Sequence, residues 1–112
     1  MTDGRLVRVG SRAQIADRGQ RVVSEFGEHE ILTLALDGQI YAIGNICTHD
    51  EVWLDDGTLH PGTCEIECPM HEGRFDLRTG EATHEPCERP VPVYKVVIDG
   101  DDVLVELPVS DR

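Results

Sequence analysis

Two short pairs of sulfur and nitrogen ligands constrain this chain more than any other feature of its sequence. Cys47 and His49 form a C-x-H pair, and Cys68 and His71 form a C-x-x-H pair, with 18 residues between the two pairs. Each pair offers one thiolate and one imidazole, and both groups are ligands of transition metals. Whatever fold the chain adopts must therefore bring two loops together around a metal centre.

These residue types leave two kinds of centre open. A zinc ion could take Cys68, His71, a residue of the first pair and Cys64, which lies four residues before Cys68. A dinuclear iron-sulfur cluster needs ligands on both irons, so each loop would supply one ligand to each iron. In that second case we expect Cys64 and Cys87 to be free thiols packed near the centre, because buried thiols behave as small hydrophobic groups.

The residues around both pairs resemble the Rieske ferredoxins of bacterial aromatic-ring-hydroxylating dioxygenases. The similarity covers about residues 5–107 and is carried by the segments Tyr41–Ile43, Cys47–His49, Glu67–His71, Gly73–Asp76, Thr79–Gly80 and Glu85–Glu88. It implies one Rieske-type 2Fe-2S cluster, in which Cys47 and Cys68 hold one iron while His49 and His71 hold the other. It also implies an all-β Rieske iron-sulfur fold, with an antiparallel β-sandwich base and a small cluster-binding subdomain of two ligand loops.

Strand and turn signals agree with that fold class. We expect strands over 6–9 and 21–26, a hairpin of 30–36 and 39–43 joined by Asp37-Gly38, and a closing hairpin of 93–98 and 103–107. Alternation places Val103, Val105 and Leu107 on one face of the last strand. Ser11 and Gln14 predict one capped helical turn that ends by Gly19.

Residues 45–92 differ from the rest of the chain. Gly, Pro, Cys, His and acidic residues dominate there, so we expect loops that are held by something other than a hydrophobic core. Within this cluster-binding subdomain, His60 and His84 are expected to be solvated, and Trp53 to be a packing anchor. We expect residues 1–112 to form a single Rieske domain.

The resemblance implies a soluble one-electron carrier that is not itself an enzyme. Its partners would be an NAD(P)H-dependent flavoprotein ferredoxin reductase and a terminal Rieske non-haem iron oxygenase. A terminal oxygenase would need a second, mononuclear iron site in a large additional domain, for which this chain has no room. Three alternatives remain open: a small Rieske subunit of another oxidoreductase such as nitrite reductase, a ferredoxin linked to iron-sulfur assembly, and a zinc-stabilised binding module.

The side chains beside the ligands predict a low reduction potential. Rieske proteins of respiratory cytochrome bc complexes carry an extra disulfide, and the matching positions here are Val52 and Met70. The same proteins place a Ser and a Tyr where this chain has Gly73 and Phe75, and those hydroxyls donate hydrogen bonds to sulfur. With fewer such donors, we expect a potential of roughly −150 mV, at the low end of the Rieske range. Gly73→Ser or Phe75→Tyr is expected to raise it.

Net charge restricts the partners. With 22 acidic and 10 basic residues the formal net charge is −12, which disfavours nucleic acids and anionic membranes. The chain shows no secretion signal and no apolar stretch of the length of a membrane span, so we expect a cytoplasmic protein, as a monomer.

Overall fold

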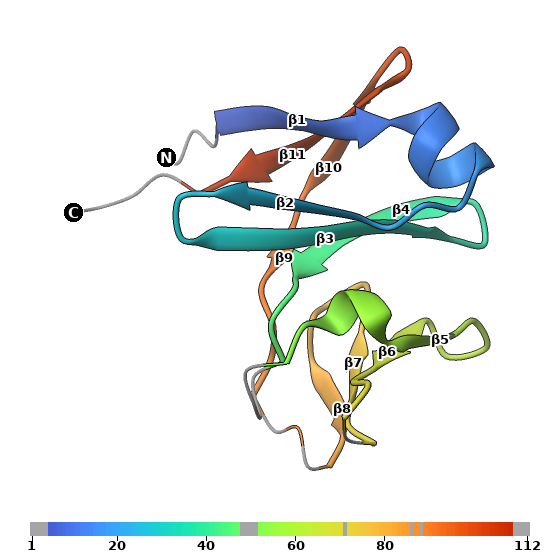
Figure 1. Ribbon diagram of the computed structural model, residues 1–112, viewed down its shortest axis with the longest axis vertical. Coiled ribbons are helices and arrows are strands. Elements are labelled where there is room, and N and C mark those ends of the chain that lie inside the picture. The colour runs from blue at the N-terminus through green and yellow to red at the C-terminus, as the bar shows by residue number, and fades with distance from the viewer. Residues whose placement is uncertain (1–4, 48–51, 71, 86, 88, 109–112) are drawn as a thin grey trace.

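The computed structural model describes residues 5–47, 52–70, 72–85, 87 and 89–108. Three antiparallel sheets make up most of this part of the chain (Figure 1). In chain order the elements are β1 (Arg5–Ser11), η1 (Ala13–Asp17), β2 (Val22–Phe26), β3 (His29–Leu36), β4 (Gln39–Gly44), η2 (Leu54–Asp56), β5 (Thr58–His60), β6 (Glu65–Glu67), β7 (Arg74–Asp76), β8 (Ala82–His84), β9 (Val93–Tyr94), β10 (Val96–Asp99) and β11 (Asp102–Leu107). The predicted all-β class is confirmed, and no helix in the described ranges is long and apolar enough to cross a membrane.

The base is a sandwich of two sheets. One has the strand order β1-β11-β10 and the other β2-β3-β4-β9. Side chains from both sheets and from η1 form the base core, whose buried members are Val9, Ile15, Ile31, Ala42, Val103, Val105 and Leu107. The predicted alternation along the last strand is therefore confirmed, because the three residues expected on one face are all buried.

Local turn chemistry also behaves as the sequence predicts. Asp37 and Gly38 both have positive φ angles, 52° and 81°, which is the conformation of a two-residue turn that matches the twist of the strands it joins. In the helical turn η1, the amide of Gln14 donates to the Ser11 hydroxyl over 3.0 Å, and the amide of Ser11 donates to the Gln14 side chain over 3.4 Å. This reciprocal pair fixes the start of the turn.

The expected strand over 93–98 is wrong as a single element. Val93 and Tyr94 form β9, which pairs with β4, whereas Val96–Asp99 form β10, which pairs with β11 in the other sheet. The chain changes sheets at Lys95, whose carbonyl still accepts a hydrogen bond from the amide of Glu106 over 3.0 Å. Strands that switch sheets at a bend are a known way of closing the corner of a sandwich.

β3 is buried on both faces, and this connects the base to a second core. Ile31 points into the base core, while Leu32 and Leu34 point the other way, into a cluster of buried residues that we call the subdomain core. Its buried members are Leu32, Leu34, Ile43, Cys47, Leu54, Ile66, Cys68, Phe75, Leu77, Cys87 and Val91. The run of apolar residues in β3 is the signature of a strand covered on both sides.

The expectation that residues 45–92 lack a core is therefore wrong. A third sheet with the order β5-β6-β7-β8 lies within this segment, below the base in Figure 1, and supplies Ile66 and Phe75 to the subdomain core. Each of its strands has only three residues, so the alternation of apolar and polar residues is too short to detect in the sequence.

Two matched substitutions test whether packing in the subdomain core stabilises the metal centre more than packing in the base core does. Ile31→Val and Ile66→Val each remove one methyl group from a fully buried isoleucine, and each is expected to cost about 0.5–1.5 kcal/mol of stability. Loss of the visible absorption of the 2Fe-2S cluster that the resemblance implies should accelerate on mild heating in Ile66→Val more than in Ile31→Val, because only Ile66 lies in the subdomain core. Equal rates of bleaching in the two variants would show that both cores stabilise the centre equally.

Candidate metal centre

The first ligand loop leaves the base at the end of β4. The amide of Cys47 donates to the carbonyl of Val52 over 2.8 Å, and the amide of Leu54 donates to the carbonyl of Asn45 over 2.6 Å. The Asn45 side chain is buried and donates to Glu30 over 2.9 Å and to Asp55 over 3.1 Å. Backbone and side-chain bonds thus fix both arms of the loop over 47–52.

The second ligand loop is the tip of the β6–β7 hairpin. It is closed by the amide of Cys68, which donates to the carbonyl of Gly73 over 2.8 Å. In both loops the amide of the cysteine therefore bonds the carbonyl five residues further along. The two closures give both cysteines the same place at the base of a six-residue loop.

Both loops deliver their cysteine to the subdomain core. Cys47 and Cys68 are 2% and 1% exposed, and both belong to the subdomain core. That Cys47 and Cys68 hold the same iron stays a prediction. His49 and His71, the predicted nitrogen ligands, lie outside the described residues.

A third thiol lies beside the first. Cys87 is buried, and its Sγ lies 3.5 Å from Sγ of Cys47. Burial, together with the neighbouring Cys47, raises the pKa of the Cys87 thiol to about 12, so this thiol is neutral at physiological pH. Cys87 and Cys64 are both free thiols, as expected. Cys87 is packed beside Cys47, and the half-buried Cys64 shares a hydrogen bond with Tyr41 at the margin of the subdomain core.

The expected effect of a serine at position 73 is corrected by the structure. A Cβ atom added to Gly73 would lie 2.2 Å from Sγ and 3.0 Å from Cβ of Cys87. The place that a serine side chain would take is already filled, so Gly73→Ser would displace the chain instead of adding a donor. Phe75 is fully buried in the subdomain core, and the expected effect of Phe75→Tyr stays a prediction.

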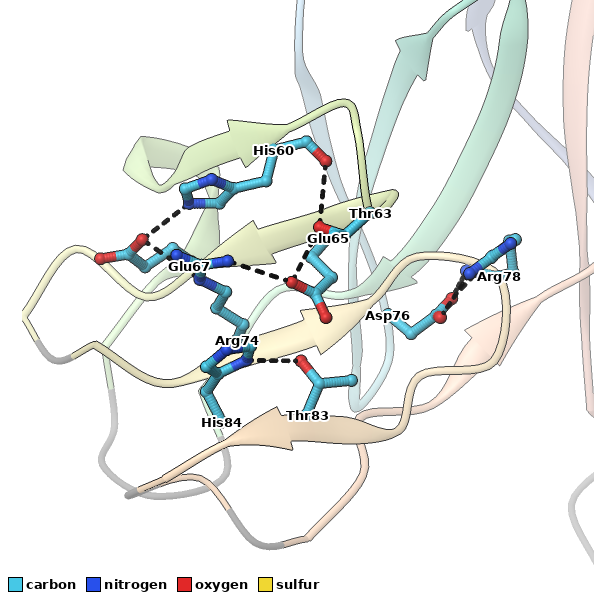
Figure 2. A network of polar contacts seen from close by, with 9 residues as sticks. All are labelled: His60, Thr63, Glu65, Glu67, Arg74, Asp76, Arg78, Thr83 and His84. Carbon is cyan, nitrogen blue, oxygen red and sulfur yellow. Dashed lines mark hydrogen bonds and ion pairs between the residues drawn. The ribbon is translucent and has the colours of Figure 1, made fainter.

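Ion pairs and hydrogen bonds between charged residues connect strands on the outer face of the third sheet, as Figure 2 shows. Arg74 on β7 lies opposite Glu67 on β6, with Nε 3.5 Å from a carboxylate oxygen, and its Nη1 donates to Glu65 over 3.3 Å. His60 on β5 lies 2.7 Å from the same oxygen of Glu67. This network joins the two strands that carry the second ligand loop, and it makes His60 half-buried instead of solvated.

Glu65 is a buried carboxylate within this network. Burial by itself would raise its pKa, but hydrogen bonds from Thr83, Thr63 and Arg74 outweigh that effect, and the pKa lies below its usual value. Because the pKa of Glu65 is lower in the folded than in the unfolded protein, ionised Glu65 stabilises the fold at pH values above the ordinary carboxyl pKa. This contribution is lost as the pH falls through the lowered value.

Three large apolar side chains near the two cysteines are exposed. Ile46 and Trp53 face each other across a backbone bridge at the stem of the first loop and are 42% and 56% exposed, and Met70 in the second loop is 70% exposed. The expectation that Trp53 is a packing anchor is wrong, because this side chain points away from the core. A sequence pattern could not reveal this, since the bridge that holds Trp53 outward depends on how the loop folds.

The sequence matches the family model of the Rieske [2Fe-2S] domain over residues 5–95. The ferredoxin component of the naphthalene 1,2-dioxygenase system of Pseudomonas aeruginosa is 41% identical over 78 residues, which cover 70% of this chain and 73% of the relative. Among solved structures, the ferredoxin of carbazole 1,9a-dioxygenase from Nocardioides aromaticivorans superimposes with a TM-score of 0.83 at 41% identity, covering 91% of this chain and 97% of that one. A complex of reduced oxygenase and oxidised ferredoxin in carbazole 1,9a-dioxygenase matches with a TM-score of 0.82 at 27% identity, covering 97% of this chain and 100% of that one.

A chain with this fold and these paired cysteine loops belongs to the Rieske [2Fe-2S] domain family. Its cofactor is one Rieske-type 2Fe-2S cluster, and the two buried cysteines at the base of matching loops fit such a group. Within the family it is a Rieske ferredoxin, an electron-transfer component and not a catalytic one.

Two arginine substitutions test the network on the outer face. Arg74→Met removes the arginine partner of buried Glu65, and we expect it to cost about 1.5–3 kcal/mol of stability because a hydrogen bond to a buried charged group is lost. Arg78→Met breaks the pair with Asp76 in the same subdomain, in which Arg78 is 60% exposed, and should change stability less. Thermal unfolding of both variants, followed by circular dichroism, makes the comparison, and equal losses would contradict it.

Proposed function

We propose that this protein is the ferredoxin component of a Rieske dioxygenase system, carrying single electrons from an NAD(P)H-dependent flavoprotein reductase to a terminal oxygenase. The observation that carries the proposal is the likeness to dioxygenase ferredoxins in sequence and along almost the whole fold. We place it in the cytoplasm as a monomer. A single domain is supported by β3 and β4, which contribute residues to both cores.

We also propose that Cys47 and Cys68 hold one iron of the cluster and His49 and His71 the other. Support comes from the two cysteine loops, which have the same backbone closure and end in the same core. When bound, the cluster supplies a centre that gains and loses one electron at a time. The zinc alternative is set aside, because the family's cofactor is an iron-sulfur cluster.

The chain's own residues bury the two cysteines away from water and leave apolar side chains exposed beside their loops. Cys47 and Cys68 are shielded by the subdomain core, while Ile46, Trp53 and Met70 leave apolar surface open next to the loops. Small apolar patches with a charged surround suit a contact that must form and dissociate quickly. These three side chains therefore support a transient partner contact at the loops.

Electron delivery to a terminal oxygenase tests the proposal directly. The dithionite-reduced protein should be reoxidised when it is mixed without oxygen with the oxidised oxygenase component of a naphthalene or carbazole dioxygenase. The natural ferredoxin of each system is the positive control. No transfer to either oxygenase, under conditions where both natural ferredoxins react, would count against this function.

Ligand substitutions test the assignment of the cluster. The reduced wild-type protein should give an EPR signal with average g below 2, since mixed sulfur and nitrogen ligation makes the two irons unequal. His49→Ala and His71→Ala should each lose the signal and the bound iron, and the protein should unfold more easily because the cluster contributes folding free energy. His29→Ala, in the base beside Tyr94, is the control and should keep both. Iron retained in either ligand variant at the wild-type level would refute the assignment.

The negative charge predicts a salt-dependent rate of electron transfer. The second-order rate constant for reduction by the reductase partner should fall several-fold between 0.1 and 1 M salt, as the screening length shrinks from about 10 Å to about 3 Å. Glu72→Gln, within the second loop, should weaken this dependence more than Asp99→Asn, which lies on the distal β10–β11 hairpin (Figure 1). Asp99 is the better control than Asp102, since Asp102 pairs with Arg8 over 2.8 Å. Equal effects from the two substitutions would leave the charge without a role in docking.

A further inference from the structure

Cys87 is fixed beside the first ligand loop by backbone contacts as well as by burial. Its amide donates to the carbonyl of His84 over 3.2 Å, in the turn that follows β8. Only 3% of the residue is exposed, and its Sγ points to Sγ of Cys47 at 3.5 Å. The fold around both residues therefore keeps the two sulfurs within hydrogen-bonding distance.

Gly73 provides the second and independent observation. Residue 73 closes the second ligand loop through its carbonyl, and the absence of a side chain there leaves the space that Cys87 fills. A Cβ on residue 73 would meet not only Sγ of Cys87 but also its backbone nitrogen, at 3.2 Å. Cys87 therefore touches the ligand residue of one loop and the closing residue of the other.

The direction of the hydrogen bond follows from the chemistry of the two sulfurs. A cysteine that holds iron is a thiolate and has no proton to give. Cys87 is not among the four proposed ligands, so its sulfur is not bound to iron and can carry a proton. Of the two sulfurs, only that of Cys87 can be the donor.

We propose that Cys87 is a positioning residue that raises the reduction potential of the cluster by donating its S–H to Sγ of Cys47. This inference rests on the proposed role of Cys47 as a ligand. Reduction adds one electron and so increases the negative charge on the iron-sulfur unit and its ligands. A donor to a ligand sulfur stabilises the reduced state more than the oxidised state, which is how hydrogen bonds to sulfur tune such centres. Cys87 thus supplies from a third segment a donor that position 73 has no room to carry.

The midpoint potentials of three holoprotein variants test this role. Cys87→Ala removes the donor and should lower the one-electron reduction equilibrium constant three- to tenfold, which is a fall of about 28–59 mV at 59 mV per tenfold. Cys87→Ser keeps a donor and should remain at or above the wild-type potential. Cys64→Ala removes a thiol that lies at the margin of the same core and should leave the potential unchanged.

Two outcomes would overturn the inference: an unchanged potential in Cys87→Ala, or equal shifts in the alanine and serine variants. If the alanine variant does not retain the cluster, Cys87→Val fills the space without a donor and should show the same fall. Iron content and the EPR signal of the wild-type protein are measured first. Their absence would refute the proposed function, whereas a normal signal with no shift in the donor-free variants refutes only the role of Cys87.

Discussion

The rest of the structure depends on the burial of cysteine sulfur in one apolar core. Cys47, Cys68 and Cys87 come from three separate segments, and all lie among the leucines and isoleucines that β3, β4, η2 and β6 supply. Thiols pack as small hydrophobic groups, so the same contacts that stabilise the subdomain also set where these three sulfurs lie. Each ligand loop is then closed by one backbone hydrogen bond from its cysteine. The chain's own packing thus fixes the positions of the two cysteines that we propose as ligands.

β3 links that core to the base. Leu32 and Leu34 face the subdomain core while Ile31 faces the base core, so the strand belongs to both cores. The ligand loops are therefore anchored to a β-sandwich and not only to each other. On the outer face of the subdomain, Arg74 and its carboxylate partners hold β6 and β7 together by charge instead of by apolar contact. Apolar packing inside and ion pairs outside thus stabilise the same hairpin.

An electron carrier of this kind must bury its centre and still reach a partner. Here the sulfurs are covered, and the exposed apolar side chains of Ile46, Trp53 and Met70 lie on the loops that carry them. The formal net charge of the chain, −12, suits basic partners. Because the sulfur environment is set by buried side chains, the potential can be tuned from inside, for example at Cys87, without altering the exposed residues.

The sequence by itself determined the features that depend on near neighbours. The Asp37-Gly38 turn and the alternation of Val103, Val105 and Leu107 were both readable, because their chemistry is fixed within a few residues. The ligand pairs are as local in the sequence, and their assignment stays a prediction. Tertiary structure alone decided where the chain changes sheets at Lys95, that residues 45–92 have a core, and that Cys87 fills the space beside Gly73. The three-residue strands of the third sheet are too short to show a period, and the contact of Cys87 with Cys47 joins residues 40 positions apart. Such features arise from packing between segments that are distant in the sequence, and no local sequence pattern indicates this packing.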